Sequence, residues 1–229
     1  MQVSIVIPTL NEAAAIGRTL DAVARMTGVC EVTVVDGGSS DGTVEIATKH
    51  GARVLGSSRG RGIQLHAGAA ASTGEALWFL HADTCPPGDA AEHILRVLEN
   101  PGIAGGNFDL CFDGASRSAR FLTRMYPHFR KLGLCYGDSG IFCRRSAYER
   151  AGGFQPFPIF EDLDLIKRLK RCGRFVHLSC QITTSSRRFE GRSFTRTFVR
   201  WMGMQVLYWM GVSPHTLGRL YSPVRGRRT

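Results

Sequence analysis

Two short runs of β-branched residues, each ending in a polar turn, constrain what this chain can fold into. The first is Val3–Ile7 with the turn Pro8-Thr9-Leu10-Asn11-Glu12, and the second is Glu31–Val35 with the turn Asp36-Gly37-Gly38-Ser39-Ser40-Asp41. A helical pattern follows each turn. Two successive β-turn-α units build a parallel sheet, and ligands bind at the carboxyl ends of its strands. Carboxylates at those ends (Glu12, Asp36 and Asp41) can accept hydrogen bonds from the base and ribose of a nucleotide.

The 229 residues contain no Pro/Ser-rich linker, repeat or low-complexity tract, and this favours one domain over residues 1–229. We expect an α/β fold whose mostly parallel central sheet is flanked by helices. Residues 1–100, with the two turns above, form a nucleotide-binding half, and they precede a second half over 101–190 and a basic helical segment over 191–229. Expected strands are 2–8, 31–35, 52–55, 76–80, 104–110 and 140–144, and expected helices are 12–26, 41–49, 62–73, 87–99, 115–133 and 161–171.

The cysteines and the amino-terminal residues indicate in which cellular compartment the protein is located. The seven cysteines form no C-x-x-C pair, which favours free thiols in a reducing cytosol over a disulfide framework or a zinc ribbon. The first strand reaches Asn11 and Glu12 too soon for a signal peptide, and no apolar run is long enough to span a membrane. We therefore expect a cytoplasmic protein.

Two acidic positions are candidates for chemistry. Asp83 directly follows the apolar run 76–80, where the chain leaves the sheet edge, and a hard divalent cation prefers oxygen ligands of this kind. Glu161 and Asp162 open a helix, where carboxylates gain from the helix dipole, so N-terminal capping is one interpretation. The other is general base catalysis, in which a carboxylate takes the proton of a hydroxyl nucleophile.

Arginines provide candidate contacts to phosphate. Arg187-Arg188 follows a polar stretch, and guanidinium groups suit bidentate contacts to phosphate. Arg59 and Arg61 alternate with glycines, which let backbone N–H groups come close to phosphate. Surface charge is the plain alternative for each. The segment is not a dinucleotide fingerprint, because position 65 lacks the third glycine.

The carboxy-terminal region concentrates positive charge. Of the net charge of +10, +8 lies from Arg187 onward, beside the aromatic and Met-rich stretch 194–210. A helix lying on anionic lipid has this composition, and so do a helix packed on its own core and a homodimer face. Peripheral association with the inner face of the membrane is thus one open alternative. We expect no nucleic-acid partner, because no recognition motif accompanies the charge.

Five elements, in order along residues 1–190, make the chain resemble family 2 glycosyltransferases with the GT-A fold: Thr9/Asn11/Glu12, Asp36 with Asp41, Asp83, Glu161/Asp162 and Arg187/Arg188. The compact length and the motifs His81-Ala82-Asp83 and Tyr136-Gly137-Asp138-Ser139-Gly140 resemble a small bacterial subfamily labelled arsenosugar-biosynthesis-linked or radical-SAM-associated transferases.

The resemblance implies an inverting transferase that moves a sugar from a UDP- or GDP-linked donor to an acceptor hydroxyl. Asp83 corresponds to the D-x-D position that holds the diphosphate through Mg²⁺ or Mn²⁺. His81 replaces the first aspartate, and it is open whether it contacts ribose, coordinates metal or satisfies a core hydrogen bond. Asp162 corresponds to the general base, with Glu161 as second candidate, and Asp138 to an acceptor or sugar contact. The candidate donor-binding residues are Pro8, Thr9, Asn11, Glu12, Asp36, Asp41, Arg59, Arg61, His81, Ala82, Asp83, Arg187 and Arg188.

Two other function classes remain. A nucleotidyltransferase would share a similar sheet but should carry a glycine-rich, Lys-bearing loop after the first strand, where this chain has Thr9-Leu10-Asn11-Glu12. A non-catalytic nucleotide-sugar-binding protein would be expected to lose Asp83 or the Glu161-Asp162 pair, and both are present. The residues do not name the sugar, the base or the acceptor.

Overall fold

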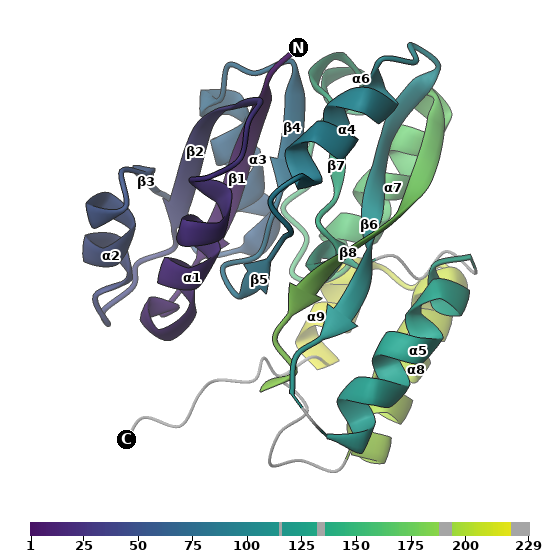
Figure 1. The fold of residues 1–229 in the computed structure, drawn as a ribbon. Coiled ribbons are helices and arrows are strands. Elements are labelled where there is room, and N and C mark those ends of the chain that lie inside the picture. The colour runs from purple at the N-terminus through teal and green to yellow at the C-terminus, as the bar shows by residue number, and fades with distance from the viewer. Residues whose placement is uncertain (115, 132–135, 188–193, 221–229) are drawn as a thin grey trace.

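The computed structural model describes residues 1–114, 116–131, 136–187 and 194–220, and eight strands lie in one sheet (Figure 1). Their order across the sheet is β3-β2-β1-β4-β7-β6-β8-β5. The strands are β1 (Val3–Thr9), β2 (Val29–Asp36), β3 (Arg53–Gly56), β4 (Ala76–Phe79), β5 (Thr84–Cys85), β6 (Ile103–Phe112), β7 (Phe142–Arg144) and β8 (Arg174–Thr184).

The sheet is mixed. Strands β3, β2, β1 and β4 run parallel to one another, and β6 pairs parallel with β8. Strand β7 lies antiparallel between β4 and β6, and β5 lies antiparallel to β8. The expected α/β class is confirmed, with its parallel part in the first four strands. The single-domain organisation stays a prediction, although strands from residues 1–100 and 101–190 share this sheet.

Helices cover both faces of the sheet because β1 alternates its side chains between two apolar clusters. Ile5 packs with Ile16 of α1 and Ile94 of α4 on one face, whereas Val6 packs with Leu65 of α3 on the other. The helices are α1 (Ala13–Val23), α2 (Thr43–Lys49), α3 (Arg61–Ala71), α4 (Ala90–Leu98), α5 (Arg117–Lys131), α6 (Arg145–Arg150), α7 (Glu161–Cys172), α8 (Phe194–Trp209) and α9 (Pro214–Leu220), with the 3₁₀ turn η1 (Gly137–Ser139).

Helices α5 and α8 lie side by side below the right-hand end of the sheet in Figure 1. Phe129 of α5 and Phe198 of α8 have ring centroids 6.1 Å apart. A third apolar cluster joins Met204 of α8 and Leu217 of α9 to Phe160, directly before α7. The expected carboxy-terminal helix therefore packs against the segment that carries Glu161 and Asp162. Within the described ranges, no helix is both long and apolar enough to cross a membrane.

Four strand ends meet at the lower edge of the sheet in Figure 1. Thr9 and Asp36 are register partners at the ends of β1 and β2. Strand β4 ends two residues before His81, and the pairing of Thr84 with Thr184 brings the end of β8 to the same edge. Residues distant in sequence are thereby collected at one place.

The sequence analysis did not predict three elements, β5, α6 and β8. Strand β5 has only two residues, and α6 is short. Strand β8 did carry a signal, because Val176, Leu178, Cys180 and Ile182 alternate with more polar residues and pack against the core. The other expected strands and helices appear with boundaries shifted by a few residues.

Gly68 sets how closely α3 can approach the sheet. A Cβ at this position would overlap Val6 and lie 2.9 Å from Val35 Cγ2. Overpacking of this kind costs about 1–3 kcal/mol. We predict that Gly68→Ala lowers the free energy of unfolding by this amount in urea titrations. The matched control is Gly203→Ala in α8, where a Cβ meets no neighbour within 4 Å. Alanine there should raise the free energy of unfolding by about 0.5–1 kcal/mol, because glycine loses more conformational entropy than alanine when a helix forms. Equal effects of the two substitutions would contradict this account of α3 packing.

Candidate active site

Asp36, at the end of β2, is held as a charged acceptor. Its carboxylate accepts hydrogen bonds from the backbone N–H groups of Gly38 and Ser39, both at 2.8 Å, and from the Thr9 hydroxyl at 3.2 Å. Burial raises the pKa of Asp36, but the hydrogen bonds from Ser39, Gly38 and Thr9 outweigh burial and leave the pKa below its ordinary value. The Asp36 side chain is therefore ionised at neutral pH.

The turns after β1 and β2 are tied to each other. Asn11 has a left-handed backbone with φ of 57°, donates its N–H to Ser39 Oγ and accepts the Ser40 N–H at its Oδ1. Asp41 accepts the Ala13 N–H at 3.1 Å and the Thr43 N–H at 3.2 Å. The Asp41 carboxylate thus caps the start of α1, where Glu12 makes no side-chain cap.

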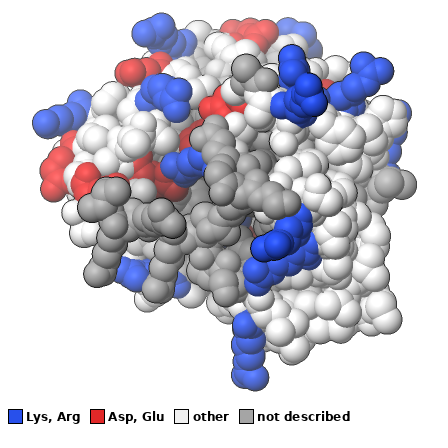
Figure 2. Space-filling model, turned by 90° about the horizontal axis from the view of Figure 1, so that it is seen from below, with Lys and Arg blue, Asp and Glu red and all other residues white. Residues whose placement is uncertain are grey.

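Arg187 lies between two of the predicted site carboxylates. Its Nη2 atom is 2.6 Å from Glu12 Oε2 and 3.1 Å from Asp83 Oδ2. Burial raises the pKa of Glu12 more than its hydrogen bond to Arg187 lowers it. Residues 12, 83 and 187 are thereby brought to one point, whereas Arg188 lies outside the described residues. In Figure 2, which views this edge from below, acidic and basic side chains lie next to one another on the left.

His81 is held in a defined orientation by Asp138. The His81 Nδ1 atom is 2.7 Å from Asp138 Oδ1. Its Nε2 atom is buried and has no hydrogen-bond partner among the residues that the structure describes. A proton on Nδ1, shared with Asp138, leaves the Nε2 lone pair available to a ligand. Ala82 has a different place, since its methyl group is in the core and its carbonyl accepts the Thr19 hydroxyl at 2.7 Å.

Glu161 and Asp162 begin α7 and are both buried. Asp162 accepts the Gly137 N–H at 2.5 Å and the Leu163 N–H at 2.7 Å. Burial, and then the neighbouring Glu161 charge, raise the pKa of Asp162. Glu161 is 3.4 Å from Arg61 Nη1. The pair therefore combines one carboxylate beside a cation with one whose affinity for a proton is increased.

Phe160, which precedes this pair, has a left-handed backbone with φ of 61°. A bulky residue rarely adopts this conformation, and packing must hold it there. The Phe160 ring is buried, with its centroid 4.9 Å from that of Tyr208 and 6.1 Å from that of Trp201, both on α8. Helix α8 thus braces the segment that presents Asp162.

Gly137 lies between His81 and Asp162. A Cβ on this residue would lie 2.9 Å from His81 Nε2 and 3.4 Å from Asp162 Oδ2. His81 and Asp162 therefore flank the same glycine, whose N–H is bonded to Asp162. The structure thus brings His81, Asp138 and Asp162 close to one another.

Of the remaining predicted residues, Arg59 lies between β3 and α3, and Pro8 lies on β1. Arg59 Nε donates to the Gly37 carbonyl at 3.3 Å, and Pro8 is the β1 residue paired with Val35. Gln64, which the sequence analysis did not single out, is buried and donates through Nε2 to the carbonyls of Thr9 and Val35, each at 2.8 Å. The sequence signal that could have identified Gln64 is a polar residue on the inner face of the alanine-rich helix.

The donor atoms at the edge fit a hard divalent cation. Asp83 and Glu12 already present carboxylate oxygens to one positive group, the Arg187 guanidinium. Mg²⁺ is commonly held by one or two carboxylates together with substrate phosphates. Among the described residues, His81 does not form a three-ligand group with these two carboxylates.

Comparisons with known proteins match this chain to one class of enzyme. The profile described as glycosyl transferase family 2 matches residues 4–152. The chain is 31% identical over 176 residues to glycosyltransferase AglE from Haloferax volcanii, covering 68% of this chain and 56% of AglE. It is 27% identical over 113 residues to an uncharacterized glycosyltransferase from a Nostoc species, covering 46% of this chain and 35% of that protein. The matched part thus spans about a third to about half of these relatives.

Two solved structures resemble the fold. Glucosyl-3-phosphoglycerate synthase from Mycobacterium tuberculosis, in complex with Mn²⁺, uridine diphosphate and glucosyl-3-phosphoglycerate, is 20% identical with a TM-score of 0.65, over 93% of this chain and 81% of that chain. Mannosyltransferase PcManGT from Pyrobaculum calidifontis, in complex with GDP-Man and Mn²⁺, is 22% identical with a TM-score of 0.65, over 80% of this chain and 56% of that chain. At such identities the likeness establishes the GT-A fold.

Proposed function

The chain belongs to glycosyl transferase family 2, and from this premise we propose that it transfers a sugar from a nucleotide-diphosphate donor to an acceptor hydroxyl with inversion at the anomeric carbon. The observation that carries the proposal is the convergence of Glu12, Asp83 and Arg187 at the sheet edge that also holds Asp36. Carboxylates and a cation at one strand edge suit a ligand that has both hydroxyl donors and a charged diphosphate.

The nucleoside lies, in this proposal, against the turns after β1 and β2. Asp36 is ionised and already accepts several hydrogen bonds, so it offers acceptor oxygens to a base N–H or a ribose hydroxyl. Gln64 fixes the carbonyls of Thr9 and Val35 behind it. The complexes of the similar structures with uridine diphosphate and with GDP-Man support a UDP- or GDP-linked donor.

The diphosphate lies beside Asp83 and Arg187. A bound Mg²⁺ or Mn²⁺, held by Asp83 with His81 or Glu12 near it, would neutralise charge on the leaving diphosphate. Arg187 now binds two carboxylates. In this proposal the Arg187 guanidinium exchanges its contacts with Glu12 and Asp83 for the phosphate oxygens of the donor. It can form bidentate hydrogen bonds with these oxygens.

Asp162 acts as the general base. It takes the proton of the acceptor hydroxyl while that oxygen forms a bond to the anomeric carbon and the carbon–oxygen bond to the diphosphate breaks. The N–H groups of Gly137 and Leu163 fix the carboxylate, and burial makes it more basic than an ordinary aspartate. Asp138 fixes the orientation of the His81 ring, which in this proposal lies near the acceptor.

The other function classes are less well supported. The turn after β1 carries Asn11 and Glu12 and has no Lys-bearing glycine loop, which speaks against a nucleotidyltransferase. A protein that only binds nucleotide sugars would not need a buried carboxylate of raised pKa beside Gly137. The subfamily resemblance carried by His81-Ala82-Asp83 and Tyr136–Gly140 stays a prediction, as does a cytoplasmic location.

We predict that Asp162→Asn lowers kcat by on the order of 10²-fold or more and leaves the Kd for the donor nucleotide unchanged. Release of nucleoside diphosphate from a panel of UDP- and GDP-sugars measures turnover. Wild-type kcat should rise with pH and level off above about 6, because the pKa of Asp162 is raised to about 6 and only its ionised form accepts a proton.

Two variants make this test selective. Asp164→Asn is the matched control, since Asp164 is also in the first turn of α7 but binds Arg168 Nε at 2.9 Å, and it should keep its activity. Glu161→Gln tests the second candidate for the base. Near-normal turnover of Asp162→Asn together with a large loss in Glu161→Gln would assign the base to Glu161. No transfer from any sugar nucleotide would contradict the proposed activity.

We also propose that the surface formed by α5, α8 and α9 docks on an anionic membrane. These three helices contain no Asp or Glu, and their basic residues include Arg117, Arg120, Arg124, Lys131, Arg196, Arg200 and Arg219. The side chain of Arg130 is instead only 10% exposed and lies 3.9 Å from Asp109. Val199, Trp209 and Met210 expose 62%, 55% and 75% of their surface. On the right-hand half of Figure 2, where α5 and α8 lie in Figure 1, Lys and Arg side chains are seen with few acidic ones. Basic and apolar side chains together fit an anionic lipid surface better than a second copy of the same basic surface.

Flotation with phosphatidylglycerol vesicles tests the docking. We expect binding that weakens steeply with salt, because each arginine near the surface contributes about 1 kcal/mol that ions screen. Met210→Glu should weaken binding more than Arg25→Glu, which removes more positive charge but lies beyond α1, outside this surface. A protein that ignores these vesicles, or forms a salt-resistant dimer in light scattering, would contradict the proposal.

A further inference from the structure

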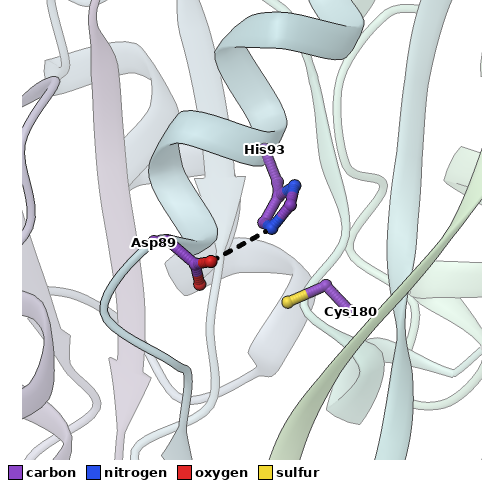
Figure 3. A group of neighbouring side chains, drawn as sticks. All are labelled: Asp89, His93 and Cys180. Atoms are coloured by element: carbon purple, nitrogen blue, oxygen red, sulfur yellow. Dashed lines mark ion pairs between the residues drawn. The ribbon is translucent and has the colours of Figure 1, made fainter.

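A group of three potential metal ligands lies outside the proposed active site. Asp89 and His93 are at the start of α4, and Cys180 is on β8. One ligand atom from each residue lies within 4.8 Å of those of the other two. Figure 3 shows the three side chains pointing into the same space between α4 and β8.

The orientation of Asp89 is the first unusual feature of this group. Asp89 occupies the N-cap position of α4, where an aspartate ordinarily accepts a backbone N–H of the first turn. Its side chain makes no such cap and is turned toward His93, with Oδ2 3.2 Å from His93 Nε2. The Asp89 carboxylate therefore lies beside the imidazole of His93, one helical turn further along, and does not cap the helix.

Cys180 completes the set from another element. Its side chain packs against the core on the side of β8 that faces α4. Cys180 is a free cysteine, and its sulfur lies within 4.8 Å of a ligand atom of Asp89 and of His93.

We propose that Asp89, His93 and Cys180 form a second metal site, for Zn²⁺, distinct from the oxygen-rich site at Asp83. Thiolate, imidazole and carboxylate are the ligands that zinc takes in proteins, whereas Mg²⁺ prefers oxygen alone. Bonds of about 2.0–2.3 Å in a tetrahedron separate ligand atoms by about 3.3–3.8 Å. The observed group needs only a modest contraction, and Asp89 and His93, whose side chains are 60% and 34% exposed, have room to make it. A water molecule can supply the fourth ligand.

The place of the group in the chain indicates what the zinc would do. Asp89 follows Asp83 after β5 and Pro86-Pro87, and Cys180 lies on β8, the strand that leads to Arg187. A metal that joins α4 to β8 would therefore fix the relative positions of the segments that carry Asp83 and Arg187. We infer a structural clamp that stabilises the site from outside it. The inference does not depend on the proposed transferase activity.

Cobalt(II) titration of the whole chain, in a thiol-free reducing buffer, tests the site. Cobalt replaces zinc in such sites, and a bound thiolate gives a sulfur-to-metal charge-transfer band that an oxygen site cannot give. We expect this band with one equivalent of Co²⁺, its loss on adding Zn²⁺, and its persistence in excess Mg²⁺. Cys180→Ser should abolish it, and His93→Ala should weaken Co²⁺ binding by on the order of tenfold or more. Zn²⁺ should raise the Tm of the wild type but not of Cys180→Ser.

The chain offers matched controls. Cys172→Ser removes a thiol of comparable burial on α7, and His50→Ala breaks another His–Asp pair, in which His50 Nε2 lies 3.4 Å from Asp21 Oδ1 with no cysteine in the group. Both variants, and Asp83→Asn, should keep the charge-transfer band. Absence of the band from the wild type, or a band that survives in Cys180→Ser, would overturn the proposal.

Discussion

The guanidinium of Arg187 ties together three segments that are far apart in the chain, and the arrangement of the site depends on that contact. Glu12 follows β1, Asp83 lies between β4 and β5, and Arg187 follows β8. Two carboxylates this close would repel each other without a cation between them. The arginine therefore offsets the repulsion between the two carboxylates at the place where we propose that the diphosphate binds.

A second constraint lies on the other side of the pocket, where backbone geometry fixes a carboxylate. Phe160 is held in a left-handed conformation by aromatic packing from α8, and Asp162 is bonded to the Gly137 and Leu163 N–H groups. Burial then raises the pKa of Asp162. Such strain and desolvation are costs to stability that functional sites commonly carry. The carboxy-terminal helix is thus coupled to the proposed base and, in our proposal, to a membrane.

The fold was largely predictable because alternation and turn residues act locally. The runs before Thr9 and Asp36 predicted two parallel strands, and parallel strands necessarily gather their end residues at one edge. The features that could not be predicted from the sequence depend on tertiary contacts. The sharing of Arg187 by Glu12 and Asp83, the capping of α1 by Asp41 and the left-handed Phe160 require partners from distant segments or a backbone angle that residue types do not encode. The roles of the site residues stay predictions.

The most direct test of the account is calorimetric titration of UDP and GDP into the protein, with Mn²⁺ and with a chelator. We predict that one of the two nucleotides binds, that Mn²⁺ strengthens its binding, and that Asp83→Asn removes the gain from Mn²⁺ while the fold stays intact. Asp21→Asn, on the exposed side of α1, should behave as the wild type. Equal affinities with metal and with chelator, unchanged by Asp83→Asn, would contradict the metal-assisted donor site at this sheet edge.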